Sequence, residues 1–393
     1  MGKSKEMKPY VFISGLALRD NNRGTAALGY GAISFLEEKG LLCEGQTIID
    51  VKERNLLDFA KWVLKSLLGK NKTLVKIDGV EWKYKKLVYP KIDNRISKYR
   101  ILSKITFLQR IVNKTSLVAA INGGDGFSDI YGGPIFENRL HGINFAMENN
   151  IPLVILPQTL GPFREQRYFE QAKKILMYAD TVFVRDDCFT VELRKMGVNY
   201  ELTNDLSYFM KPEPWSIDIK TEESIGLNVS GLAWDNNFHT LAGQFAFYPK
   251  LLEDIIKLFQ AKGKKIYLIS HSFNYNQPEP NNDDLAAARE LYQRIENKKN
   301  VVLIDRDLIS PQVKYVISKM SFFIGTRMHA NFAAIFTHVP LFGLAYSYKF
   351  KGAFEHNGIF NRTANINNIK DEEIGKILSA IEKAYQEDVI ENN

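Results

Sequence analysis

Cysteine is scarce in this chain, which has only Cys43 and Cys188 among its 393 residues. Neither lies within metal-ligand spacing of the other, and two cysteines cannot form a disulfide framework. The acidic residues are also too dispersed along the chain to suggest a metal site. We therefore expect a cytoplasmic protein that needs no bound metal and no cofactor.

Long hydrophobic runs are missing as well. No stretch of about 18 uncharged apolar residues occurs, so we expect no membrane-spanning helix. The start of the chain is basic, but the apolar segment that follows at residues 11–17 is short and fits a first strand better than a signal peptide. The first predicted turn lacks the Gly-x-Gly-x-x-Gly pattern, so a dinucleotide is not expected either.

The positive charge is concentrated in one part of the chain. The net charge is +7, yet residues 52–114 alone hold 17 Lys/Arg against five Asp/Glu, a local balance of +12. Two amphipathic segments, at 56–68 and 96–112, predict helices in this basic insertion. They fit a peripheral contact with an anionic membrane, and they fit equally well ordinary helices that cover a sheet with solvated lysines. Nucleic acid is the weakest candidate partner, because no recognition module is present.

Short apolar segments alternate with segments of helical periodicity along the whole chain, which is typical of parallel α/β folds. The polar, proline-containing stretch at 211–215 is the best candidate for a linker. We predict two doubly wound Rossmann-like domains that face each other across a cleft, at residues 1–212 and 213–393. Ligands of such sheets bind near the carboxyl ends of the strands.

The segment 322–334 is the strongest candidate for a site. An apolar strand at 322–324 runs into a Gly-Thr turn, then Arg327, and then a helix that carries His329. A guanidinium beside a helix N-terminus makes a site for an anion. The alternative is that Arg327 binds a neighbouring carbonyl group and His329 packs in the core. Both can reach one ligand only if Arg327 lies in the turn before the helix.

Other polar residues follow predicted strands. Gly123 and Gly124 end the strand at 116–122 and precede Asp125 and Asp129, which are either site carboxylates or helix caps. Arg185 is followed by Asp186, so it is a second anion ligand or half of a structural ion pair. His271 follows the strand at 266–270 and is a ligand residue or a loop histidine bonded to the backbone.

Several of these segments together resemble the polysaccharide pyruvyl transferases, whose fold is like that of the two-domain GT-B glycosyltransferases. The matching motifs are Asn22-Arg23-Gly24, Asn122-Gly123-Gly124-Asp125-Gly126, Leu156-Pro157-Gln158-Thr159-Leu160-Gly161-Pro162, Val184-Arg185-Asp186, Asn204-Asp205, Gly325-Thr326-Arg327-Met328-His329-Ala330 and Tyr346-Ser347-Tyr348-Lys349. The chain departs from the family pattern at Thr25, where an acidic residue is common, and at Asp125, where a third glycine is common.

The resemblance implies transfer of a pyruvyl group from phosphoenolpyruvate to two hydroxyls of one sugar, in a bacterial-type surface polysaccharide or its precursor. A cyclic ketal and phosphate would result. It implies that Arg327 and Arg185 bind the donor and that His329 transfers a proton. It also implies that Asp125 or Asp129 acts on an acceptor hydroxyl. The other residues expected along the substrate site are Gly123, Gly124, Gln158, His271 and Asn22.

The resemblance places the acceptor in the N-terminal domain and phosphoenolpyruvate in the C-terminal one, and leaves open whether the acceptor is lipid-linked. Two other functions remain compatible with the sequence. One is a GT-B glycosyltransferase, or a related sugar 2-epimerase, that uses a nucleotide sugar. The other is a non-catalytic protein that binds a sugar or a lipid headgroup. With any of these functions, we expect the protein in the cytoplasm, either free or at the inner face of the membrane.

Overall fold

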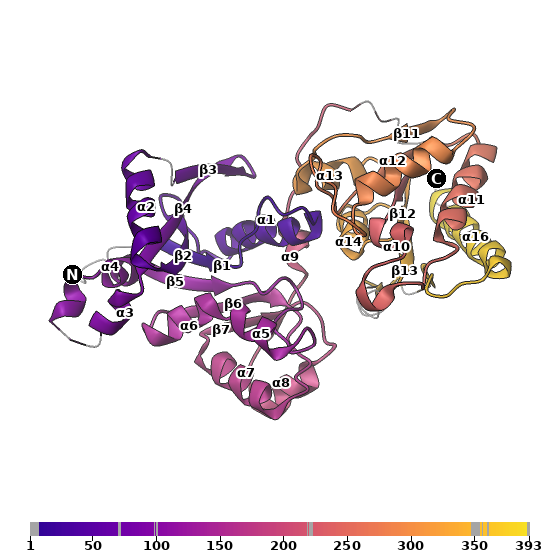
Figure 1. Ribbon diagram of the computed structural model, residues 1–393. Helices are drawn as coiled ribbons and strands as arrows, with labels where there is room; N and C mark the ends of the chain where they lie inside the picture. Colours follow the sequence, from indigo (N-terminus) through magenta and orange to yellow (C-terminus); the bar gives the residue numbers. More distant parts are fainter. Residues whose placement is uncertain are drawn as a thin grey trace. The chain divides into compact units, whose positions relative to one another are not determined.

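The computed structural model describes residues 8–69, 72–97, 99, 101–217, 219, 223–346, 354–355, 357–359 and 361–390 (Figure 1). The Ser347-Tyr348-Lys349 motif therefore lies outside the described residues. The chain forms two compact units, Met1–Leu16 with Leu28–Phe209 and Ala17–Ala27 with Met210–Asn393. The short segment Ala17–Ala27, which carries Asn22, thus packs with the second unit although its neighbours along the chain belong to the first.

The first unit is built on an eight-stranded sheet in the order β3-β4-β2-β1-β5-β6-β7-β8. Its strands are β1 (Tyr10–Ser14), β2 (Thr47–Arg54), β3 (Lys72–Ile77), β4 (Val80–Pro90), β5 (Thr115–Ala120), β6 (Leu153–Gln158), β7 (Thr181–Val184) and β8 (Glu201–Leu202). All neighbours pair in parallel except β3 and β4. The strand order reverses between β1 and β5, which is where a doubly wound sheet binds ligands.

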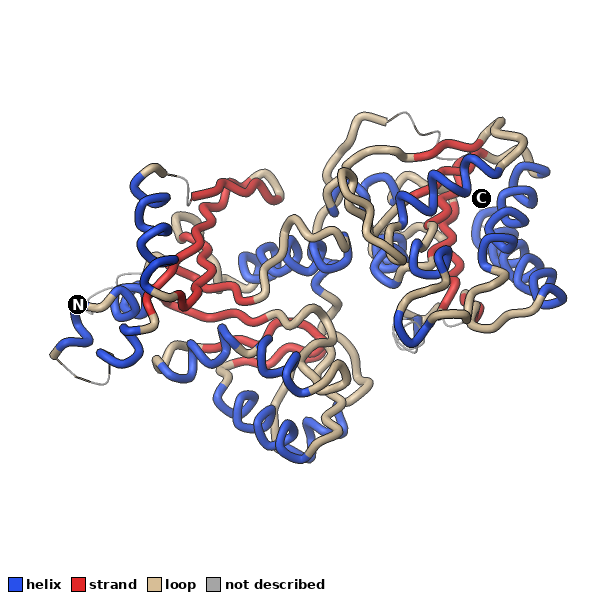
Figure 2. Tube along the Cα trace, in the orientation of Figure 1, coloured by secondary structure: helices blue, strands red, loops and turns tan. Residues whose placement is uncertain are grey.

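Helices surround this sheet (Figure 2). They are α1 (Arg23–Glu38), α2 (Leu56–Leu67), α3 (Ile92–Ile96), α4 (Phe107–Lys114), α5 (Gly133–Arg139), α6 (His141–Glu148), α7 (Gln166–Tyr178), α8 (Thr190–Met196) and α9 (Leu206–Phe209), with a 3₁₀ turn η1 (Leu102–Ile105). The first residues of α1 belong to the second unit and the rest to the first.

The basic insertion, predicted as helical, also contains a β-hairpin. Strands β3 and β4 pair antiparallel, with Ile77 opposite Val80. The two residues between them, Asp78 and Gly79, have φ angles of 52° and 86°. Positive φ at both central residues is the geometry of a two-residue hairpin turn, and Asp-Gly is a preferred sequence for it. The Asp78-Gly79 pair therefore marks a hairpin that the helical prediction for this segment did not include.

The second unit has a six-stranded, wholly parallel sheet in the order β11-β10-β9-β12-β13-β14. Its strands are β9 (Ser224–Asn228), β10 (Lys265–Ile269), β11 (Val301–Leu303), β12 (Phe322–Gly325), β13 (Leu341–Ala345) and β14 (Thr363–Asn365). The strand order reverses between β9 and β12, so this sheet too has a point where ligands are expected.

Side chains of these strands alternate between two hydrophobic clusters, one on each face of the sheet. Ile266 and Leu268 of β10 join the first cluster, and Tyr267 and Ile269 join the second. The described helices and turns of this unit are α10 (Gly231–Asp235), η3 (His239–Leu241), α11 (Tyr248–Ala261), α12 (Asp284–Arg294), α13 (Ser310–Ile317), α14 (Met328–Ile335), α16 (Asp371–Tyr385) and η4 (Gln386–Ile390). In the described part of the chain, none of the helices could cross a membrane.

Candidate active site

Polar residues of the second unit gather where β9, β10 and β12 end. Asn228, the last residue of β9, accepts hydrogen bonds on its Oδ1 from the backbone N–H groups of Thr326 (3.2 Å) and Arg327 (2.8 Å). Arg327 has an extended backbone, with φ −89° and ψ 134°, and α14 begins at the next residue. The guanidinium is therefore carried by the turn between β12 and α14, as it must be if Arg327 and His329 are to reach one ligand.

Arg327 is held by a buried carboxylate. Its Nη2 and Nε lie 2.6 Å and 3.0 Å from Oδ1 of Asp284, and Nη2 also donates to Oδ1 of Asn282 at 2.9 Å. Burial lowers the pKa of Arg327, but Asp284 outweighs it and the pKa lies above its ordinary value. The guanidinium is thus a permanent cation with a fixed orientation.

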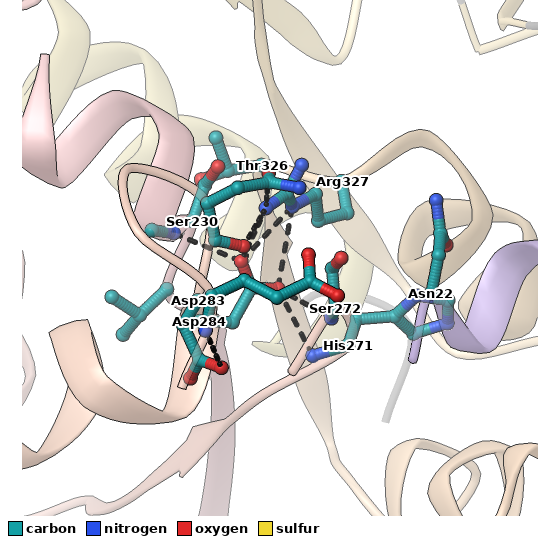
Figure 3. Close-up of polar contacts among 12 residues, drawn as sticks. Asn22, Ser230, His271, Ser272, Asp283, Asp284, Thr326 and Arg327 are labelled. Carbon is teal, nitrogen blue, oxygen red and sulfur yellow. Dashed lines mark hydrogen bonds and ion pairs between the residues drawn. The ribbon is translucent and has the colours of Figure 1, made fainter. Parts of the chain in front are cut away.

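Asp284 connects three turns at this edge of the sheet (Figure 3). Its side chain is fully buried and accepts hydrogen bonds from the backbone N–H groups of Gly231 (2.9 Å), His271 (3.0 Å) and Ser272 (2.8 Å). The carboxylate charge is therefore shared between Arg327 and three peptide groups. This arrangement fixes the turns after β9 and β10 relative to the turn after β12.

The Asn22-Arg23-Gly24 loop lies against the end of β10. The Arg23 N–H donates to the carbonyl of His271 at 2.8 Å, and Asn22 and Ser272 form an antiparallel β-bridge. The Arg23 guanidinium stacks over the ring of Phe273, 4.2 Å from its centroid. The loop therefore adds a second arginine and Asn22 to the residues that follow β10.

His329 lies next to the same loop. A Cβ atom added to Gly24 would lie 2.6 Å from Nδ1 of His329, so only glycine leaves room for the imidazole. His271 is buried, and its pKa is lowered by that burial and then by the positive charges of His329, Arg327 and Arg23. These side chains are therefore near neighbours, and the two arginines among them are ion-paired, Arg327 with Asp284 and Arg23 with Asp307.

The lowered pKa of His271 predicts acid sensitivity. In the unfolded chain a histidine binds a proton near pH 6.5, whereas buried His271 stays neutral well below that pH. The unfolded state then binds more protons, so the free energy of unfolding falls as the pH drops below about 6.5. We expect His271→Gln to flatten this decline in urea unfolding curves measured at about pH 7.5 and 5.5. His239→Asn, at an exposed position, is the control and should leave the decline unchanged; an unaltered decline in His271→Gln would refute the assignment.

The glycine loop of the first unit rests on Arg185. Gly123 and Gly124 follow β5 with φ angles of 76° and 87°, and a Cβ on Gly124 would lie 2.9 Å from Nη1 of Arg185. Nη1 of Arg185 donates to Asp205 at 2.7 Å, and its Nε donates to Oγ1 of Thr159 at 3.0 Å. Arg185 is therefore engaged in a buried ion pair beneath the loop, the structural alternative that the sequence left open.

Two more of the predicted residues of this unit are bonded to the backbone. Gln158 is fully buried, and its Oε1 accepts from the N–H of Asn122 at 2.9 Å, which ties β6 to the end of β5. Asp129 accepts from the N–H groups of Arg164 (2.8 Å) and Glu165 (2.9 Å), just before α7. Asp129 therefore binds the backbone just before α7 without capping the helix, whose N-cap is Glu165, and its catalytic role stays a prediction.

Asp125 has a different environment from Asp129. It is half-buried, and its Oδ2 accepts a hydrogen bond from the hydroxyl of Tyr131 at 2.7 Å. The ring of Tyr131 is exposed and lies below the guanidinium of Arg139, 5.4 Å from its centroid. Of the two predicted carboxylates, Asp125 is the one that a ligand in solution can reach.

Sequence reasoning missed Asp284, the partner of Arg327. Two aspartates mark the start of α12, Asp283 before it and Asp284 as its first residue, and an aspartate in this place ordinarily caps a helix. Asp283 is that cap, because its side chain accepts from the N–H of Ala286. A helix needs only one capping aspartate, so the second aspartate was the sequence signal that Asp284 has another role. Among the residues that the structure describes, no group of His, Cys, Asp or Glu is arranged to hold a metal ion.

Comparison with known families is consistent with these motifs. A family model described as polysaccharide pyruvyl transferase matches residues 22–348, from the Asn22 loop to the end of the second sheet's β13 region. None of the curated proteins matches this chain.

Solved structures with this fold include several epimerases. A putative UDP-N-acetylglucosamine 2-epimerase from Listeria monocytogenes has a TM-score of 0.55 at 11% identity, over 97% of this chain and 91% of its own. UDP-GlcNAc 2-epimerase from Methanocaldococcus jannaschii gives 0.53 at 11% identity, over 97% and 92%. MnaA from S. aureus, solved with UDP, gives 0.53 at 15%, over 98% and 91%. Identities this low show the fold alone, and they confirm the predicted GT-B-like α/β class.

Proposed function

Because the chain belongs to the polysaccharide pyruvyl transferase family, we propose that it transfers the pyruvyl group of phosphoenolpyruvate to a saccharide. The family makes it a transferase with a saccharide acceptor. The products in this proposal are a cyclic ketal, formed with two hydroxyls of one sugar, and inorganic phosphate. The reaction is an addition followed by a substitution, so it needs no redox cofactor.

The observation that best supports binding of phosphoenolpyruvate is the cluster of residues around Arg327. Phosphoenolpyruvate has a carboxylate and a phosphate, and both require cations and N–H groups. Arg327 provides a fixed guanidinium in the turn before α14, with Arg23, His271 and His329 as its near neighbours. Asp284 balances the charge of Arg327, and three backbone N–H groups also bind its carboxylate, so the pair leaves the guanidinium in a fixed orientation for the donor.

His329 is proposed as the group that transfers the proton. Protonation of the methylene carbon of phosphoenolpyruvate leaves an oxocarbenium-like centre at the adjacent carbon, which the first acceptor hydroxyl attacks as it loses its own proton. Breaking the bond to phosphate regenerates that centre, and the second hydroxyl closes the ketal. An imidazole titrates near working pH, so it can give and then take up these protons. Gly24 and α14 hold the ring in place.

Asp125 is proposed as the carboxylate that acts on the acceptor hydroxyl. It is half-exposed beside the glycine loop of the first unit, whereas Asp129 is bonded to two backbone N–H groups. Tyr131 would hold the Asp125 carboxylate in position through its hydroxyl. Gly123 and Gly124 would let the acceptor approach the backbone closely.

Asn substitutions at Asp125 and Asp129 separate these two roles. Asp125→Asn keeps an oxygen for Tyr131 and loses the base, so we expect kcat to fall by about 10²-fold with little change in stability. Asp129→Asn keeps one acceptor oxygen for the N–H groups of Arg164 and Glu165 but loses the negative charge and the second acceptor, so it should lower the free energy of unfolding by about 1–2 kcal/mol and keep most of kcat. Steady-state kinetics and urea unfolding measure both. The reverse pattern would move the catalytic role to Asp129.

A donor screen tests the function as a whole. The protein is incubated with a saccharide panel and either phosphoenolpyruvate or UDP-sugars, and phosphate release, UDP release and product mass are measured. We expect phosphate release that depends on both phosphoenolpyruvate and a saccharide, with a product heavier by one pyruvyl ketal. UDP release without consumption of phosphoenolpyruvate would replace this proposal with a glycosyltransferase or epimerase. A ligand-binding protein would release neither.

A further inference from the structure

Exposed hydrophobic side chains are concentrated in the basic insertion. In the described part of the chain 18 large hydrophobic side chains are exposed, and 12 of them lie between residues 56 and 107. They are Leu56, Leu57, Leu64, Leu67, Leu68, Leu74, Ile92, Tyr99, Ile101, Leu102, Ile105 and Phe107. Single exposed leucines are common on proteins, but a cluster of this kind marks a surface that contacts something.

Helix α2 presents most of these leucines. None of its residues is buried. Leu57 and Leu64 are 67% and 63% exposed and lie seven residues apart, so they share a face. Lys61 stands between them, and Lys65 follows on the same side. The opposite side packs against β4, where Nε1 of Trp62 donates to the carbonyl of Lys86 at 2.8 Å. The leucine face of α2 therefore points away from the fold.

The α2 face continues into η1 and α4. The rings of Phe59 in α2 and Phe107 in α4 are in edge-to-face contact, with centroids 4.9 Å apart. Just before α4, Ile101 and Ile105 are 83% and 67% exposed. Figure 1 shows α2 and α4 at the same end of the first sheet. We call this surface, formed by the exposed side chains of α2, residue 101, η1 and Phe107, the leucine–lysine face.

The charge of the insertion indicates what covers this face. Residues 52–114 carry a balance of +12, from 17 Lys/Arg and five Asp/Glu. Two copies of the face would bring like charges together, which disfavours a homodimer through this surface. Apolar side chains interleaved with lysines fit an interface that is anionic at its surface and apolar beneath. An anionic lipid bilayer has both properties.

We propose that the leucine–lysine face docks the protein on an anionic membrane. The leucines of α2 insert among the upper acyl groups, and Lys61, Lys65 and Lys104 contact lipid phosphates. The helices lie in the plane of the interface and do not span the bilayer. Docking brings the first unit, with its proposed acceptor site at Asp125, to saccharides that are anchored to lipid. This last step rests on the proposed transferase function, whereas the docking itself does not.

Vesicle flotation tests the docking without any donor or acceptor. The full chain is mixed with vesicles of phosphatidylcholine alone or of phosphatidylcholine with phosphatidylglycerol. We expect binding to the anionic vesicles that weakens with salt, because the screening length falls from about 10 Å at 0.1 M to about 3 Å at 1 M. Failure to bind anionic vesicles at low salt would overturn the proposal.

Matched variants identify the face. Lys61→Glu/Lys65→Glu should weaken binding to the anionic vesicles by at least about 30-fold, and Leu57→Ser/Leu64→Ser by roughly 100-fold. Lys174→Glu and Met177→Ser change exposed residues of α7 and serve as controls that should bind normally. All four proteins should keep the parent's unfolding midpoint, since these side chains are exposed. Equal losses in the control variants would overturn the assignment to this face.

Two further measurements separate the alternatives. Sedimentation of the full chain should show no self-association through this face. If the chain does self-associate, if Leu57→Ser/Leu64→Ser abolishes that association and if vesicles do not bind, the face is an interface between copies. Phosphate release with phosphoenolpyruvate and a water-soluble saccharide should be unchanged in the leucine variant. Vesicle binding without such turnover would refute the transferase proposal and leave the docking proposal intact. Turnover without vesicle binding would refute the docking proposal and leave the transferase proposal intact.

Discussion

Arg327→Ala is expected to reduce turnover to background and to destabilise the second unit at the same time. The guanidinium is the proposed donor-binding cation, and loss of one preorganised charge contact lowers kcat by about 10²–10³-fold. The same change leaves the fully buried Asp284 without its ion-pair partner. Breaking a buried pair costs about 3–5 kcal/mol, and we expect the lower end because three backbone N–H groups still bind the carboxylate.

Loss of activity in Arg327→Ala alone would not separate binding from folding, so two companion variants are needed. Arg327→Lys keeps the positive charge beside Asp284 and loses the planar pair of donors. It should remain folded at about the parent's unfolding midpoint and still lose about 10²-fold in kcat. Arg327→Leu/Asp284→Asn removes both charges and should recover stability without activity.

The Arg327 variants give a clear negative result if the assignment is wrong. Full kcat in Arg327→Lys would show that the paired N–H groups of the guanidinium do not bind phosphoenolpyruvate. Full kcat in the doubly neutral variant would remove Arg327 from the donor site altogether. In that case the ion pair with Asp284 would be purely structural. Unfolding is followed by circular dichroism and turnover by phosphate release on the same samples.

The fold class was accessible from the sequence because its signals are local. Strands such as β5 and β6 are mostly apolar, as central parallel strands are, and the intervening helices have clear periodicity. The hairpin of β3 and β4 was missed although Asp78-Gly79 marks its turn, because the amphipathic lysine-rich segments beside it dominated the prediction. Both the Asp-Gly turn and the amphipathic periodicity are readable in the sequence, and the turn was the one that described residues 72–90.

The composition of the site depends on contacts that local patterns do not encode. Arg327 and His329 were identified because a turn and a helix start are adjacent in sequence. Asp284 is far from Arg327 in sequence, and only the pairing of β9 with β10 and β12 brings their turns together. The packing of Ala17–Ala27 with the second unit is likewise invisible in a strand-loop-helix pattern that fits the first.

The role of Arg185 illustrates the same limit. An arginine at the end of a buried strand is compatible with an anion ligand and with an ion pair, and the sequence left both open. The structure places its guanidinium against Asp205 and beneath Gly124. Because both charged groups are buried, removing either would leave the other uncompensated. Arg185 therefore supports the glycine loop through this ion pair, and its role in donor binding stays a prediction.

Gly24→Ala is expected to lower kcat nearly as much as removal of the His329 imidazole. A Cβ at this position would lie 2.6, 2.8 and 2.9 Å from Nδ1, Cγ and Cβ of His329. Contacts below 3.0 Å with both the ring and its stem require the imidazole and the loop to move. If His329 transfers the proton, its displacement should cost about 10²–10⁴-fold in kcat, with a smaller effect on the KM for phosphoenolpyruvate.

The backbone does not explain such a loss, because Gly24 lies in α1 and alanine is the better helix former. Gly375→Ala is the matched control, because Gly375 lies inside α16 with no atom within 4 Å of an added Cβ. This variant should raise the free energy of unfolding by about 0.5–1 kcal/mol and keep full turnover.

The decisive comparison is Gly24→Ala/His329→Gln. Residues that act through one group are not additive, so the double variant should be no slower than His329→Gln. Multiplicative losses would show that Gly24 acts elsewhere, and undiminished kcat in Gly24→Ala would exclude a precisely placed His329 from the reaction.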